Sequence, residues 1–206
     1  MAMYLGSNKV AVTKTIETHI TSMKAFFDAG GRCAYSLAEN FKGCWQIEDT
    51  ANVIEMSNMF RVCYNLREVP QFSTREAGFM DAMFQGCPNI KTVPLFNTSQ
   101  VTRTDNMFNG CSSLTTVPKF DMSRVNYMLD MFKDCTSLET IHMININADL
   151  DISASTKFTR EALMEIIGNL KAQASGTKTL TVGETNLAKL TEEDKKIATD
   201  KGWILA

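Results

Sequence analysis

Hydrophobic residues recur every 24 positions through the middle of this 206-residue chain. A Met-Phe pair, followed by a cysteine four residues after the methionine, begins at Met59, Met83, Met107 and Met131. The other columns at this spacing are Leu66, Ile90, Leu114 and Leu138; Val69, Val93, Val117 and Ile141; and Phe72, Phe96, Phe120 and Ile144. Identical spacing over four units predicts one structural coil that is copied and stacked, so that neighbours bury each other's apolar face.

Each unit combines two hydrophobic periods. Residues at helical offsets are Val125, Met128, Met131, Phe132 and Cys135, which predicts one face of a short helix. Polar residues that could cap the helix of their own unit are Asp121 and Ser123, and, one unit earlier, Asn97 and Ser99. After the cysteine, Leu-x-x-Val-Pro-x-Phe predicts a short strand. Because proline cannot donate a ladder hydrogen bond, Pro70, Pro94 and Pro118 limit that strand to two or three residues.

The two ends of the chain differ from the repeats. Residues 3–5 and 10–13 flank Gly6-Ser-Asn8 as a predicted hairpin, and a helix is expected over 15–27. Toward the other end, Thr159 should begin a helix that buries Leu163, Ile166, Ile167 and Leu170, and residues 179–182 alternate like a strand. Thr191-Glu-Glu-Asp resembles a capping box for a last helix that Gly202 closes. Leu180 and Ile204 are again 24 residues apart, so this segment should continue the coil.

These patterns predict an α/β chain, a leucine-rich-repeat-like solenoid with short parallel strands, short helices and a helical C-terminal cap. We expect three parts: an N-terminal hairpin and helix cap over 1–40, the repeats over 41–146, and an α/β cap that continues the solenoid over 147–206.

The cysteines Cys63, Cys87, Cys111 and Cys135 occupy the same position of each unit. Equivalent side chains of parallel coils point the same way, so we expect buried free thiols that act as small hydrophobes rather than disulfides. The pattern leaves the state of Cys33 and Cys44 open.

Composition narrows the class of function. A formal net charge of −2 argues against nucleic-acid binding, which usually needs a basic excess. The sequence contains no 18-residue apolar run, so no membrane insertion is expected. It also lacks Cys-x-x-Cys, His-Glu-x-x-His, phosphate-loop and nucleophile-elbow motifs. We therefore expect no enzyme activity, no metal and no cofactor, and we expect His142, in the proline slot of its unit, at the surface.

The combination Met-Phe-x-x-Cys-x-x-Leu-x-x-Val-Pro-x-Phe-Asp-x-Ser-x-Val resembles the BspA-like leucine-rich repeats, including the variant abundant in mycoplasma lipoproteins. The resemblance covers residues 59 to about 146, with a shorter unit at 41–44. It implies a non-enzymatic binding or adhesion module. The N-terminus does not resemble a secretion signal, which favours a phage structural protein of the tail or fibre, located in the virion; a bacterial cell-surface adhesin and a structural spacer in a virion are the alternatives.

Residues between the hydrophobic columns of the strand segment vary from unit to unit, as expected for a surface that a partner reads. The candidate binding face is Arg67, Gln71, Lys91, Leu95, Thr115, Lys119 and Glu139. Thr140 and Met143 are expected along the same edge. The expected partner is a protein or glycan on a host surface, or another virion protein, and a homo-oligomer would add avidity.

Overall fold

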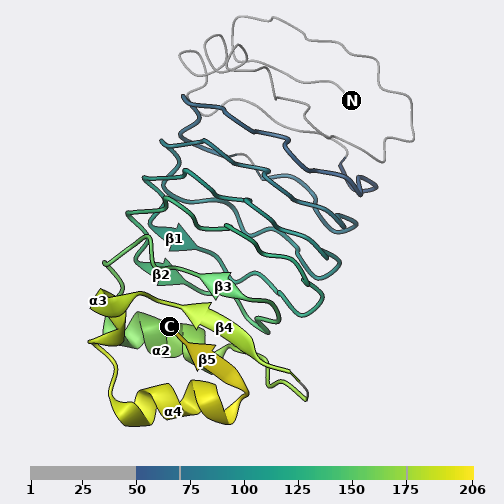
Figure 1. The fold of residues 1–206 in the computed structure, drawn as a ribbon. Coiled ribbons are helices and arrows are strands. Elements are labelled where there is room, and N and C mark those ends of the chain that lie inside the picture. The colour runs from purple at the N-terminus through teal and green to yellow at the C-terminus, as the bar shows by residue number, and fades with distance from the viewer. Residues whose placement is uncertain (1–49, 70, 175) are drawn as a thin grey trace, which may run out of the picture.

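The computed structural model describes residues 50–206, apart from residues 70 and 175 (Figure 1). The predicted N-terminal hairpin and helix, the short unit at 41–44, Cys33 and Cys44 lie outside the described residues. The elements in chain order are β1 (Thr116–Val117), β2 (Thr140–Ile141), β3 (Leu150–Asp151), α2 (Arg160–Gly168), β4 (Lys178–Thr181), α3 (Glu184–Leu187), α4 (Glu192–Asp200) and β5 (Trp203–Leu205). The strands form two small parallel sheets, β1-β2 and β3-β4-β5.

The 24-residue repeats stack on one another in parallel (Figure 1). Parallel bridges join Glu55 to Phe79, Phe79 to Arg103 and Arg103 to Tyr127, each step spanning one repeat. In the strand segment, Thr116 pairs with Thr140 at the same spacing. The predicted register between repeats is therefore confirmed on two separate segments of the coil.

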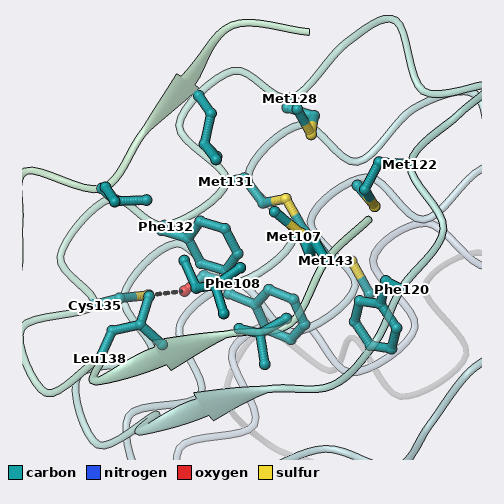
Figure 2. Close-up of a cluster of buried hydrophobic side chains, with 14 of the residues drawn as sticks. Met107, Phe108, Phe120, Met122, Met128, Met131, Phe132, Cys135, Leu138 and Met143 are labelled. Carbon is teal, nitrogen blue, oxygen red and sulfur yellow. Dashed lines mark hydrogen bonds between the residues drawn. The ribbon is translucent and has the colours of Figure 1, made fainter. Parts of the chain in front are cut away.

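The core is built from like residues placed over like residues. The rings of Phe60, Phe84, Phe108 and Phe132 lie nearly parallel, with centroids 5.3, 5.7 and 5.8 Å apart. Each of these rings is buried, as is the methionine that precedes it. Stacked aromatic pairs add about 0.5–1.5 kcal/mol to the free energy gained from the area they bury. Figure 2 shows the Phe108 and Phe132 rings inside this cluster, beside Met107 and Met131.

The four repeat cysteines of the described chain are buried, as predicted, and Cys87, Cys111 and Cys135 are free thiols. Figure 2 shows the Cys135 thiol pointing at a backbone oxygen, which belongs to Phe108 and lies 3.1 Å from Sγ. The thiols of Cys87 and Cys111 make the same contact with Phe60 and Phe84, at 3.0 and 3.1 Å. Each of these three sulfurs thus packs as a hydrophobe and also donates to the preceding repeat.

The short helix predicted for the Met-Phe segment does not form, and this prediction was wrong. The segment is a series of turns in which alternate N–H groups point in different directions. The N–H groups of Asn106, Phe108 and Gly110 donate to carbonyls of the next repeat at 2.8–3.0 Å. The intervening N–H groups of Met107, Asn109 and Cys111 donate three residues back within their own repeat. A helix would use every N–H four residues back, which this pattern excludes.

Left-handed residues make this alternation possible. They recur every 24 positions in two columns: Asn58, Ala82, Asn106 and Asp130, and Val62, Gly86, Gly110 and Asp134. Two left-handed residues four positions apart interrupt any helix between them. The expected caps serve an earlier turn instead, because Asn97 and Asp121 accept hydrogen bonds from the N–H groups of Ser99 and Ser123 at 3.0 and 2.9 Å, ahead of the Met-Phe segment.

The fourth repeat departs from the predicted columns by one residue. Thr140 pairs with Thr116 at a spacing of 24, but Ile144 pairs with Asp121 at a spacing of 23. Ile144, expected in the phenylalanine column, is therefore only half-buried, and Met143 is fully buried instead. Figure 2 shows Met143 pointing into the cluster that contains Phe120.

The C-terminal segment contains the predicted helices and strand. Thr159 caps α2 by accepting a hydrogen bond from the Ala162 N–H, and Thr191 and Asp194 form the capping box of α4. The carboxylate of Asp194 is buried and binds both Nε and Nη2 of Arg160, at 2.8 and 2.6 Å, which joins the starts of α2 and α4. This guanidinium lowers the pKa of Asp194. The spacing between β4 and β5 is one residue longer than the predicted 24, because Leu180 pairs with Leu205 rather than with Ile204.

Candidate binding face

The seven residues of the candidate face lie on two columns of the strand segment. Arg67, Lys91, Thr115 and Glu139 form the first column, and Gln71, Leu95 and Lys119 form the second. Because Thr116 and Val117 of β1 pair with Thr140 and Ile141 of β2, the positions next to them in the chain are held at a fixed spacing. The leucine and valine columns anchor these segments to the core; they are buried from Ile90 and Val93 onward and half-buried at Leu66 and Val69.

Backbone hydrogen bonds bring three of the predicted residues together in order. The N–H and the Oγ1 of Thr115 both donate to the carbonyl of Lys91, at 2.9 and 3.2 Å. The N–H of Glu139 donates to the carbonyl of Thr115 at 2.8 Å. Lys91, Thr115 and Glu139 therefore follow one another on adjacent repeats, with both charged side chains exposed and Thr115 half-buried.

The second column is more apolar than the first. The amide Nε2 of Gln71 donates to the carbonyl of Leu95 at 3.4 Å, and the side chain of Leu95 is 60% exposed. Lys119 is exposed at the equivalent position of its repeat, and Arg67 of the first column is exposed as well. Met143, expected on this edge, is buried because of the one-residue shift in the fourth repeat. The candidate face is therefore only one column wide in the fourth repeat, where β2 meets the C-terminal segment.

The thiols of Cys87, Cys111 and Cys135 are unreactive, because hydrogen bonding and burial raise the pKa of Cys87 and burial raises the pKa of the other two. Burial raises the pKa of Cys111 well above its ordinary value of 9.0, and it raises the pKa of Cys135 to about 12. A thiol of this kind stays protonated at neutral pH and is a poor nucleophile. Their role in the described part of the chain is packing.

His142 lies beside the candidate face and is half-exposed, in agreement with the predicted surface position. Its Nδ1 lies 2.7 Å from Oε1 of Glu165 in α2, so the imidazole links β2 to the first helix of the C-terminal segment. Within residues 50–206, no group of three or more His, Cys, Asp and Glu side chains could hold a metal ion. No helix in this range is long and apolar enough to cross a bilayer.

Sequence reasoning missed a second set of outward-facing residues on the segment before each Met-Phe pair. One column is Glu55, Phe79, Arg103 and Tyr127. Two residues further along the chain lie Asp81, Asp105 and Leu129, whereas Ser57 is buried at the equivalent position of the first repeat. The sequence does contain a pattern that indicates these outward-facing residues: variable positions lie on both sides of a buried column. Reading the segment as a helix concealed it, because a helical period does not place residues two apart on the same face.

The profile of a family described as "Mycoplasma protein of unknown function, DUF285" matches residues 21–143, which is more than half of the chain. The chain belongs to this family. The resemblance to mycoplasma-type BspA-like repeats is thereby confirmed at the level of the family. No curated protein and no solved structure matches the chain. For this DUF285 protein, function must be argued from the surface itself, because the family description assigns none.

Proposed function

We propose that this DUF285 protein is a non-enzymatic binding module, a leucine-rich-repeat solenoid that recognises a protein or glycan on a host surface. The observation that carries the proposal is the contrast between the columns of one repeat. Buried columns keep the same residue type from repeat to repeat, whereas Lys91, Thr115 and Glu139 change character while backbone bonds hold them in line. A fixed frame that presents varied side chains is the arrangement that repeat proteins use for binding.

The setting that we favour is a phage particle, with the chain in the tail or a fibre. Many copies in one particle would convert weak individual contacts into strong attachment. Mass spectrometry of purified particles and of the bacterial envelope separates this setting from a cell-surface adhesin. Enrichment in the envelope, with none in particles, would reject the phage role while leaving the binding role open.

The binding role is tested by reversing two charges on the candidate face. Lys91→Glu with Lys119→Glu changes two exposed side chains, so the fold should persist while attachment of the labelled protein to cell walls of candidate hosts falls about tenfold or more. Lys133→Glu with Lys157→Glu is the matched control, because it changes the net charge equally at exposed positions outside this face. Equal attachment by both double variants would reject this face, and no attachment by the unmodified protein would reject the function.

A further inference from the structure

Exposed hydrophobic side chains gather on the segment that precedes each Met-Phe pair. Of the eight large hydrophobic side chains exposed in the described chain, four lie here: Ile54, Phe79, Tyr127 and Leu129, at 45, 37, 58 and 71% exposure. We call these four residues, together with Arg103 between them, the aromatic face. A concentration of this kind on one segment contrasts with the isolated exposed hydrophobics that are ordinary on protein surfaces.

The aromatic face is continuous across three repeats. Phe79, Arg103 and Tyr127 are successive partners in parallel bridges, so their side chains emerge one repeat apart. The guanidinium carbon of Arg103 lies 5.0 Å from the centre of the Tyr127 ring, within the range of a cation–π contact. The backbone N–H of Leu129 donates to Oδ1 of Asp105 at 2.8 Å, which places the most exposed leucine next to this stack.

The polar groups around the face carry a net negative charge. Arg103 is paired with Asp105 through Nη2 at 2.8 Å and with Asp81 through Nε at 3.4 Å. Glu55 begins the same column and accepts a hydrogen bond from the Ser57 N–H at 2.9 Å. Two carboxylates therefore compensate the positive charge of Arg103, and Glu55 adds a third carboxylate two repeats away in the same column.

We propose that the aromatic face binds a protein segment in which apolar side chains stand next to lysine or arginine. The exposed leucine and isoleucine would be covered by the apolar side chains, and the uncompensated carboxylates would pair with the cations. The face contains tyrosine and arginine, which are among the residue types that most often dominate protein interfaces. A glycan fits less well, because its hydroxyl groups do not cover Leu129 and Ile54. The inference rests on the proposed binding function and adds to it a second face and a partner class.

The test uses the full chain and a random peptide display library of about twelve residues per peptide. Peptides selected on the immobilised protein should combine lysine or arginine with aromatic or aliphatic residues. Binding of a synthetic selected peptide, measured by fluorescence polarisation, should weaken about tenfold or more in Tyr127→Ser with Leu129→Ser. Tyr64→Ser with Ile197→Ser is the matched control, since it removes one exposed tyrosine and one exposed aliphatic side chain from positions outside both faces, and it should bind normally.

Each other outcome overturns the inference. Equal weakening in both double variants would mean that the peptides read general hydrophobicity, and selection of peptides without basic residues would contradict the charge argument. Binding to a glycan array that disappears only in Tyr127→Ser with Leu129→Ser would make a glycan the occupant. Cell-wall attachment that fails only in Lys91→Glu with Lys119→Glu, while no peptide is selected, would uphold the proposed function and reject the aromatic face.

Discussion

The thiol of each described repeat cysteine is buried among like residues. Single cysteines should therefore lower the stability of the fold at alkaline pH. Burial raises the pKa of Cys135 to about 12, whereas a thiol of the unfolded chain ionises near 9.0. Above pH 9 the unfolded chain loses a proton that the folded chain keeps. The unfolded state is thereby favoured, and stability present below pH 9 is lost as the pH rises toward 12.

Replacing Cys135 with alanine should remove one part of this alkaline loss. The variant is destabilised at neutral pH by the small cavity, by about 1 kcal/mol. That difference from the unmodified protein should shrink and then reverse sign between pH 9 and 11, changing by up to about 1.4 kcal/mol per pH unit, because only the unmodified chain has an ionisable thiol at this position. Urea unfolding at a series of pH values measures it. Val117→Ala, a buried substitution without a titrating group, should show a constant difference; a constant difference for Cys135→Ala would contradict the argument.

The element that distinguishes this chain is the turn segment that carries the Met-Phe pair. Its N–H groups alternate between the next repeat and their own repeat, and the backbone can alternate only where a left-handed residue resets its direction. Gly110 has a φ of 78°, which costs a residue with a Cβ about 1–2 kcal/mol. A Cβ at this position would be in ordinary contact with Gly86, 3.5 Å away, so conformational strain is the main cost.

Gly110→Ala should therefore lower the free energy of unfolding by about 1 kcal/mol. Gly168→Ala is the control, because Gly168 ends α2 without a positive φ and a Cβ there meets nothing within 4 Å. That control should be neutral or more stable by up to about 1 kcal/mol, as alanine favours helix. Thermal and urea unfolding of both variants would measure the difference, and equal effects would show that the turn geometry is not limiting.

At the scale of the whole molecule, stability is distributed over the interfaces between repeats. Bridges, phenylalanine stacks and cysteine–carbonyl contacts all join residues one repeat apart or close to it. Each repeat therefore stabilises its two neighbours, and the fold should tolerate loss of a complete unit better than loss of part of one.

Deleting residues 83–106 tests this property. The deletion removes one complete 24-residue unit and joins Ala82 to Met107, which restores the native order of columns. We expect a folded protein with a lower melting temperature, because one interface between repeats is lost. Deleting residues 83–94 removes half of a unit, shifts every later column and should abolish cooperative unfolding. Circular dichroism and limited proteolysis distinguish the two outcomes, and equal behaviour of both deletions would contradict a repeat-by-repeat register.

The sequence by itself determined which residues meet between repeats. A fixed period places Phe84 over Phe60 whatever the local backbone does, and short polar side chains at Thr159 and Thr191 identify helix starts through local hydrogen bonds. It also determined the exposed strand column that runs through Lys91 and Glu139, because variable positions between constant ones must face outward.

Only the tertiary structure decided how the Met-Phe segment folds and where the last repeat shifts. Hydrophobic spacings of three and four residues suit both a helix and a pair of turns. The turns form because the carbonyls of the next repeat accept hydrogen bonds from this segment, and an isolated segment lacks these acceptors. The burial of Met143 instead of Ile144 likewise depends on pairing with Asp121, a contact between residues far apart in the chain. The aromatic face follows from the same cause, since residues two apart point outward together only when the backbone is not helical.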